Sequence, residues 1–191
     1  MYISKIFEVT DKKEAFTFIK QNAFGQIASQ VEGRLFSSHI PFYFDGDLLV
    51  GHIAKKNPQW KEIETQEVLV MFQGQDAYIS PSWYDSPGVP TWNYQAVHIY
   101  GEVTLITEEG RLKKIVDTLT SQYESSFETP WIPEYNESML NAIVGFEMKI
   151  TDIQCKYKLS QNRSEQDKKQ VIEALKARGS AQLSQAMKMV L

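Results

Sequence analysis

The spacing of apolar residues changes several times along this chain of 191 residues, and each change predicts a different kind of element. Apolar residues between positions 15 and 23 recur at the interval of an α-helix. Asp11 and Glu14 stand in front of them at capping-box spacing, and Gly25 is a suitable helix end. These signals predict an N-terminal helix.

From Gly25 onward the apolar residues alternate with polar ones, which is the pattern of half-buried β-strands. The pair Asp45-Gly46 between two such runs indicates a hairpin. A short helix is expected to begin at Asn57-Pro58, with Asn57 as its cap. The predicted strands cover residues 25–30, 35–44, 48–54, 68–72, 94–106 and 145–153.

Helical spacing returns in the second half of the chain. Thr107 is the expected cap of a helix that runs to about Tyr123, and residues 139–143 form a further helical turn. Ser164 and Asp167 have capping-box spacing, and the helix behind them is expected to stop near Gly179. A last helix carries an apolar stripe that must be covered, made of Leu183, Ala186, Met187 and Val190.

Several antiparallel strands, interrupted by helices and closed by a later strand, predict a mainly β protein with peripheral helices, built as a small barrel. Residues 1–160 are expected to form the barrel domain with its N-terminal helix. Residues 161–191 are expected to be a C-terminal helical appendage of the same domain.

Composition adds three constraints. The formal net charge of −4 does not suit a protein that binds DNA through a basic face. The single cysteine, Cys155, excludes an internal disulfide and is expected to be a packed thiol. No signal peptide and no apolar run of about 18 residues is evident, so we expect a cytoplasmic protein without a membrane span.

The segment from Phe72 to Gly101 holds the most unusual loop of the sequence. Its aromatic residues are held among three prolines, which restrict the backbone, so the rings can present flat faces to a planar ligand or a second subunit. The alternative is that the rings close one end of the barrel. Polar neighbours favour the ligand or subunit interpretation. The residues in question are Trp83, Tyr84, Trp92 and Tyr94, with Ser80, Ser82, Thr91 and Asn93 among them.

Two clusters could bind phosphate. Lys55 and Lys56 follow His52 and precede the helix start at Asn57, where free N–H groups favour an anion. A second cluster, Lys158 to Arg163, also precedes a capped helix. Both could equally be solvated caps. A phosphate site combined with aromatic faces is what flavin mononucleotide (FMN) requires.

Other chemistry finds little support. The three histidines, His39, His52 and His98, have no metal-ligand spacing, so no metal site is expected. There is no GxSxG motif and no evident Cys–His pair, so hydrolysis is not expected.

The chain resembles the PaiB family of FMN-binding negative transcriptional regulators along nearly its whole length. The matching stretches are HIPFYF from His39, GHIAKKNPQW from Gly51, FQGQDAYISPSWY from Phe72, VPTWNYQAVHIYG from Val89 and KLSQNRS from Lys158. The resemblance implies an FMN-binding split β-barrel of the pyridoxamine-phosphate-oxidase type. It also implies a homodimer with the flavin at the subunit interface, and repression of genes for sporulation and protease synthesis.

The resemblance also suggests which residues contact the cofactor. The phosphate-side candidates are His52, Lys55, Lys56 and Asn57. The ring-side candidates are Ser80, Trp83, Tyr84, Thr91, Trp92 and Asn93. The candidates that close the site, from the same or the other subunit, are Lys158, Ser160, Gln161 and Asn162.

Other functions remain open at this point. The protein could be an FMN-dependent oxidoreductase acting on a small molecule, although no catalytic residue can be assigned. It could be a related barrel that binds haem through a histidine, or a scaffold whose aromatic residues only build a dimer interface. Contact with DNA is implied by the family resemblance alone.

Overall fold

The computed structural model describes residues 1–191, apart from the side chain of Glu137. The helices are α1 (Lys12–Gln21), α2 (Glu109–Glu124), α3 (Glu137–Leu140), α4 (Glu165–Ala177) and α5 (Ala181–Met187). The strands are β1 (Glu8–Val9), β2 (Phe24–Val31), β3 (Arg34–Asp45), β4 (Leu48–Ala54), β5 (Glu67–Ile79), β6 (Thr91–Ile106) and β7 (Ile143–Lys158). None of the described helices has the length and apolar character needed to cross a bilayer.

The strands form one antiparallel sheet in the order β1-β7-β4-β3-β2-β5-β6, and β7 also pairs with β6. That additional pairing closes the sheet, as expected for a barrel. The hairpin at Asp45-Gly46 is confirmed, because Asp45 faces Leu48 across β3 and β4 and Gly46 has a positive φ of 61°. The mainly β architecture with peripheral helices is therefore confirmed.

The chain forms two compact units, and each unit is assembled from separate stretches. The first unit comprises Met1–Asn22, Gln73–His98 and Gln154–Leu191, and the second comprises Ala23–Phe72 and Ile99–Ile153. Strands β5, β6 and β7 contribute residues to both. The expected boundary at residue 160 falls inside the first unit.

The strand predictions differ from the structure mainly at their ends. Strand β4 has the predicted bounds, whereas β5 continues beyond Phe72 to Ile79 and β7 continues to Lys158. In β6, Val97, Ile99 and Val103 are buried, and Ile106 rather than Leu105 occupies the last buried position.

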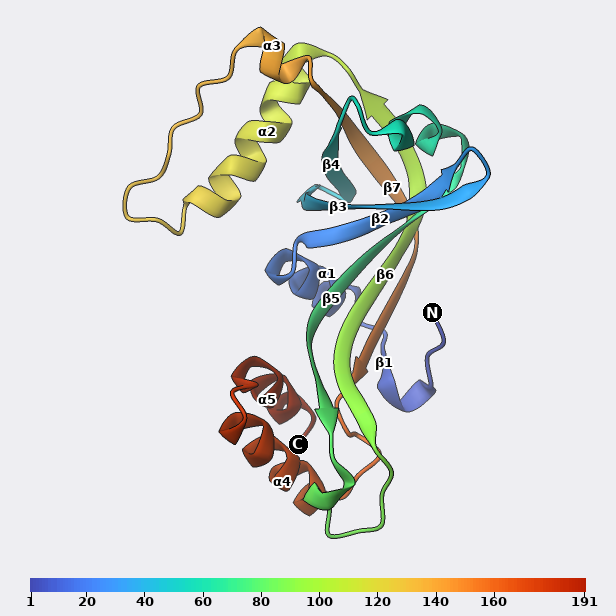
Figure 1. The fold of residues 1–191 in the computed structure, drawn as a ribbon, viewed down its shortest axis with the longest axis vertical. Coiled ribbons are helices and arrows are strands. Elements are labelled where there is room, and N and C mark those ends of the chain that lie inside the picture. The colour runs from blue at the N-terminus through green and yellow to red at the C-terminus, as the bar shows by residue number, and fades with distance from the viewer. The chain divides into compact units, whose positions relative to one another are not determined.

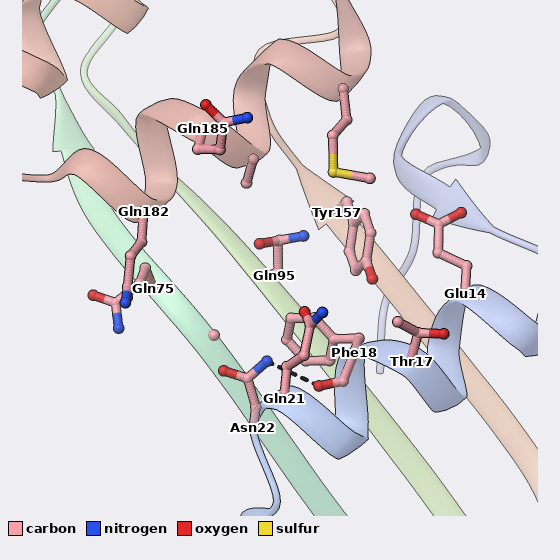
Figure 2. A pocket seen from close by; sticks show the side chains of 13 residues that line it. Glu14, Thr17, Phe18, Gln21, Asn22, Gln75, Gln95, Tyr157, Gln182 and Gln185 are labelled. Atoms are coloured by element: carbon pink, nitrogen blue, oxygen red, sulfur yellow. Dashed lines mark hydrogen bonds between the residues drawn. The ribbon is translucent and has the colours of Figure 1, made fainter. Parts of the chain in front are cut away.

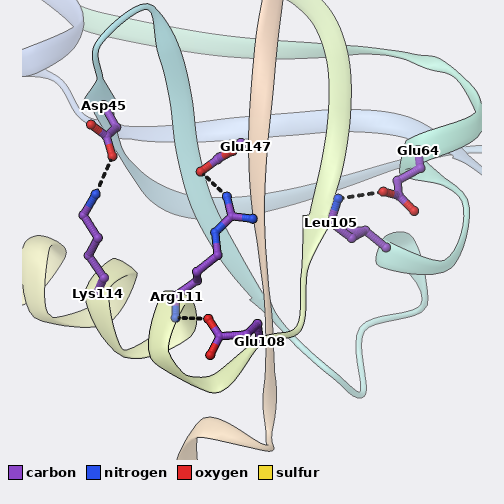
Figure 3. A network of polar contacts seen from close by, with 7 residues as sticks. All are labelled: Asp45, Glu64, Leu105, Glu108, Arg111, Lys114 and Glu147. Atoms are coloured by element: carbon purple, nitrogen blue, oxygen red, sulfur yellow. Dashed lines mark hydrogen bonds and ion pairs between the residues drawn. The ribbon is translucent and has the colours of Figure 1, made fainter.

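In the second unit, α2 packs its apolar face against the sheet. Leu112, Ile115 and Leu119 join a buried cluster with Tyr43 and Val50. Ion pairs link the same helix to neighbouring strands (Figure 3), through Arg111 to Glu147 at 2.6 Å and Lys114 to Asp45 at 2.8 Å. Exposed pairs of this kind contribute little, so the apolar contacts hold the helix in place.

The cap of α2 differs from the prediction. Glu108, not Thr107, is the N-cap, and its carboxylate accepts hydrogen bonds from the backbone N–H groups of Gly110 and Arg111 at 2.8 Å each. These bonds to the ionised form lower the pKa of Glu108. A carboxylate at this position also complements the helix dipole, which explains the choice of cap.

In the first unit, α4 and α5 lie beside each other at the C-terminal end of the chain (Figure 1). Leu183 and Met187 in α5 are fully buried, whereas Ala186 and Val190 are only partly buried, so the terminal apolar stripe is partly covered within the chain. Ser164 caps α4 by accepting from the N–H of Asp167, as its spacing predicted. Helix α1 is capped by Asp11 as predicted, but it ends at Gln21, before Gly25.

Candidate functional site

His52, Lys55, Lys56 and Asn57, which we call the phosphate-side group, lie together in the second unit. His52 is near the end of β4, opposite Gly145 of β7, and Lys55 and Lys56 are exposed in the turn that follows. Among the described residues, no hydrogen-bond partner is present for the buried Nδ1 of His52. Burial lowers the pKa of His52, so the imidazole is neutral at physiological pH and Nδ1 is available for a hydrogen bond.

Asn57 caps a single 3₁₀ turn, Pro58–Lys61, where the sequence predicted a short helix. Its side-chain oxygen accepts from the N–H of Gln59 at 3.0 Å, and its Nδ2 donates to Ser38 Oγ at 2.7 Å. Ser38 donates in turn to the fully buried Gln59. Asn57 therefore fixes the turn that carries the two lysines.

Ser38 and Gln59 were missed as site-supporting residues. Ser38 lies in the middle of β3, where the alternating pattern gives no sign of a distant partner. Gln59 directly follows the predicted helix start, where the sequence gives no sign that a glutamine is buried.

The remaining candidates lie in the first unit, where the structure brings the closing residues to the ring-side loop. Lys158 Nζ donates to Thr91 Oγ1 and, at 2.8 Å, to the carbonyl oxygen of Trp92. Asn93 Nδ2 donates to Ser160 Oγ at 2.9 Å. Burial, with the neighbouring charge of Lys156, lowers the pKa of Lys158. Two segments that are far apart in the sequence thus contact each other within one chain.

The space between these two segments is small. The cavity has a volume of about 80 Å³, and it is lined by Tyr84, Thr91, Asn93, Ser160 and Asn162, among others. Small-molecule sites have volumes of roughly 300–1,000 Å³, whereas 80 Å³ has room for only a few waters. Within the first unit, this cavity cannot enclose a flavin ring.

Gln161 and Ser80 have local structural partners. Gln161 accepts from the N–H of Leu159 at 2.7 Å and donates to the carbonyl of Tyr157 at 2.5 Å, which closes its own turn. The Oγ of Ser80 accepts from the N–H of Ser82 at 3.2 Å and caps a 3₁₀ turn. Both residues shape the loops around the cavity.

The aromatic residues of the loop fall into two classes. Tyr84 is only 9% exposed and lies 4.2 Å from the Arg163 guanidinium, while Trp83 lies 5.7 Å from Arg178. Cation–π contacts within the chain therefore occupy these two rings. Trp92, in contrast, is 53% exposed.

Trp92 packs edge-on against Tyr78, which is 45% exposed, with 6.1 Å between the ring centroids. Sequence reasoning missed Tyr78, because the strand containing it was predicted to stop at Phe72. The continued alternation of β5 was the available signal. The rings of Trp92 and Tyr78 are thus partly exposed in this unit.

Asp167 anchors the other end of the same loop. This buried carboxylate accepts from the N–H of Asp85 at 2.8 Å and from the hydroxyl of Ser86 at 2.6 Å. The hydrogen bond from Ser86, followed by the backbone bond from Asp85, lowers the pKa of Asp167. Asp167, which also belongs to the capping box of α4, thereby fixes the loop at Asp85 and Ser86.

The phosphate-side group fits the terminal phosphate of FMN. Two exposed ammonium groups, Lys55 and Lys56, lie close in sequence to His52, whose buried Nδ1 has no hydrogen-bond partner among the described residues. Charge-assisted bonds of this type are the strong ones for a phosphate. The donor set is therefore suitable for the anionic end of the cofactor.

The antiparallel sheet, closed by the pairing of β6 with β7, has the architecture of a split β-barrel. The family model described as "Putative FMN-binding domain" matches residues 1–152. The chain is also 44% identical over 185 residues to the Bacillus subtilis protein named protease synthase and sporulation protein PAI 2, covering 92% of this chain and 89% of that protein. The chain belongs to this FMN-binding family, so the PaiB resemblance and the FMN expectation are confirmed.

Solved structures support the same fold. The flavocytochrome Anf3 from Azotobacter vinelandii superposes with a TM-score of 0.68 at 16% identity, covering 87% of this chain and 77% of that one. A Listeria innocua protein described as a "Putative Pyridoxamine 5'-phosphate oxidase" superposes with a TM-score of 0.51 at 18% identity, covering 75% of this chain and 95% of that one. The predicted split barrel of the pyridoxamine-phosphate-oxidase type is confirmed.

Proposed function

We propose that this protein binds FMN through the phosphate-side group and acts as a negative regulator of sporulation and protease synthesis genes. The observation that carries the binding proposal is the donor set itself, two exposed lysines near a neutral histidine whose Nδ1 has no partner in the part of the chain that the structure describes. Bound FMN would supply redox chemistry, and the chain would hold and orient it. The regulatory part of the proposal is supported by the name of the Bacillus subtilis relative.

We further propose that the protein works as a homodimer. The cavity beside the aromatic loop, at about 80 Å³, is too small for a flavin ring, whereas Trp92 and Tyr78 offer open faces. A second copy of the chain would supply the missing wall, with Lys158 and Asn93 at its edge. This arrangement supports a ring environment shared between two subunits.

The binding proposal is tested by absorption spectroscopy of the purified protein after addition of FMN and desalting. Wild-type protein should retain flavin absorbance, and the double variant Lys55→Ala, Lys56→Ala should lose it, because the phosphate loses both cations. The matched control is Lys12→Ala, Lys13→Ala, another adjacent pair of exposed lysines, which should retain the flavin. Retention of FMN by the Lys55, Lys56 variant would refute the phosphate assignment.

The regulatory proposal needs a separate measurement, because a ligand changes regulation only through different affinities for two states of the protein. Binding to operator DNA should be compared for the FMN-free, oxidised and reduced forms of the protein. A change in DNA affinity with flavin state supports a direct regulator. Equal, salt-insensitive DNA affinity combined with rapid bleaching of FMN by a reduced nicotinamide would favour the oxidoreductase instead.

A further inference from the structure

The first unit contains a second pocket, and its lining residues differ in chemistry from the phosphate-side group. It has a volume of about 460 Å³ and lies between α1, the strands β5, β6 and β7, and the C-terminal helix α5 (Figure 2). This volume is within the range of small-molecule sites, which is roughly 300–1,000 Å³. We call it the glutamine pocket, after the five glutamines in its lining, Gln21, Gln75, Gln95, Gln182 and Gln185.

The glutamine side chains are available to a ligand. In the part of the chain that the structure describes, none of the five makes a side-chain hydrogen bond to the protein, although Asn22 beside them donates to the carbonyl of Phe18 at 2.9 Å. Each free primary amide offers two N–H donors and one carbonyl acceptor. The pocket can therefore match donors and acceptors on the polar body of a ligand.

The charge of the pocket is negative. Glu14 and Tyr157 are the ionisable residues in its lining. Burial raises the pKa of Tyr157, so the phenol stays neutral. The partly buried carboxylate of Glu14 has no hydrogen-bond partner among the described residues, and Figure 2 shows it on α1 at the end of the pocket away from Gln75 and Gln182.

Among the described residues, no cation forms an ion pair with Glu14. Lys156, next to Tyr157 in β7, contacts the rings of Tyr2 and Tyr94 and donates to the Tyr2 carbonyl at 3.0 Å. Successive residues of a strand point to opposite faces, so the ammonium of Lys156 lies on the face away from the pocket. An anionic ligand such as a flavin phosphate is disfavoured here, and a cationic ligand is favoured.

Aromatic side chains form part of the pocket wall. The rings of Phe18 and Tyr157 are 5.5 Å apart and tilted by 49°. Gly74 leaves room for the Phe18 ring, because a Cβ at position 74 would lie only 2.9 Å from that ring. Aromatic faces bind both the apolar stem and the charged head of an organic cation.

From the carboxylate without a partner, the free amides and the aromatic wall, we propose that the glutamine pocket binds a small organic ammonium ion whose body carries hydrogen-bonding groups. Glu14 is the counterion for the ammonium, the aromatic wall contacts the stem, and the glutamines contact the polar body. The site is independent of the flavin proposal, because its residues are separate from the phosphate-side group.

The test is titration calorimetry on the full chain, after incubation with FMN, with three probes of matched shape. γ-Aminobutyramide carries an ammonium and an amide, pentanamide replaces the ammonium by a methyl group, and glutaramate replaces it by a carboxylate. The ammonium probe should bind most tightly. Glu14→Gln should weaken it about 10- to 100-fold, the range expected for a lost charged hydrogen bond, and should remove its advantage over pentanamide.

Two further variants keep the result interpretable. Glu173→Gln removes an exposed carboxylate of α4 outside the pocket and should leave binding unchanged. Ala186→Phe places a ring in the pocket from α5 and should abolish binding of the ammonium probe, while thermal unfolding and FMN retention report that the variant is folded. Equal binding of all three probes, no binding of the ammonium probe to wild-type protein, or full affinity in Glu14→Gln would each overturn the proposal.

Discussion

Replacing Gln59 by alanine should destabilise the protein strongly, because its side chain is fully buried and makes three hydrogen bonds. Its Nε2 donates to the carbonyl of Ile27 at 3.1 Å and to Ser29 Oγ at 2.9 Å, and its Oε1 accepts from Ser38 Oγ at 2.7 Å. These bonds connect the turn of the phosphate-side group to strands β2 and β3.

The magnitude follows from which partners would lose their bond. Ser38 would still accept from Asn57, so two buried groups, the Ile27 carbonyl and the Ser29 hydroxyl, would be left without the glutamine. An unsatisfied buried polar group costs roughly 1–3 kcal/mol. We therefore expect Gln59→Ala to lower the free energy of unfolding by about 2–6 kcal/mol.

Gln66 provides a matched control in the same unit. It too makes three side-chain hydrogen bonds, accepting from the Gln30 N–H at 2.7 Å and donating to the carbonyls of Gln30 at 2.9 Å and Glu62 at 3.2 Å. Gln66 is only partly buried, so water can replace the lost amide. Gln66→Ala should cost less than about 1 kcal/mol, near the usual net value of one hydrogen bond.

Urea unfolding of both variants and the wild type measures the difference, as a shift of the midpoint at constant slope. A large loss for Gln59→Ala and a small loss for Gln66→Ala would confirm that burial, not the number of bonds, sets the cost. Equal losses for the two variants would refute the reasoning. FMN retention by Gln59→Ala would additionally report whether the turn still presents its lysines.

Three further predictions concern other parts of the chain. Gly101→Ala would place a Cβ 2.4 Å from the carbonyl oxygen of Lys149, so thermal unfolding should reveal a loss of about 1–3 kcal/mol, as for other overpacked sites. Burial raises the pKa of Cys155 to about 12, so a thiol reagent at neutral pH should label the native protein much more slowly than the urea-unfolded chain. Burial, and then the charge of Asp11, raise the pKa of Glu14 above its usual value of 4.5. The folded state therefore holds the proton of Glu14 more tightly than the unfolded chain does, and ionised Glu14 destabilises the fold at a pH above its raised pKa. Glu14→Gln should therefore be more stable than the wild type at neutral pH, and denaturant unfolding below pH 4.5 should show that gain disappear.

Strand β4 was predictable to the residue because its alternation is uninterrupted and a hairpin signal precedes it. Strand β5 was not, since Gln73, Gly74 and Gln75 break the apolar run that ends at Phe72. Those residues belong to the strand because their backbone continues in the sheet, and the side chains of Gln73 and Gln75 are exposed. A sequence pattern records which side chains are buried, whereas backbone pairing can continue without an apolar face.

The sites show the same distinction. The phosphate-side group was suggested by the sequence, because its members are almost consecutive. The glutamine pocket was not, since Glu14, Gln75, Gln95 and Gln185 come from four separate elements, and each alone reads as an ordinary polar surface residue. Only the folded arrangement places their side chains around one space.

The aromatic loop was expected either to present rings to a ligand or subunit or to close one end of the barrel, and its aromatic residues differ in their contacts and exposure. Trp83 and Tyr84 contact Arg178 and Arg163, so their rings hold the loop against the C-terminal segment. Trp92 keeps more than half of its surface exposed, and its carbonyl holds the ammonium of Lys158. An exposed tryptophan whose backbone is fixed in this way costs little entropy on binding, which favours Trp92 as the ring that meets a flavin or a second subunit.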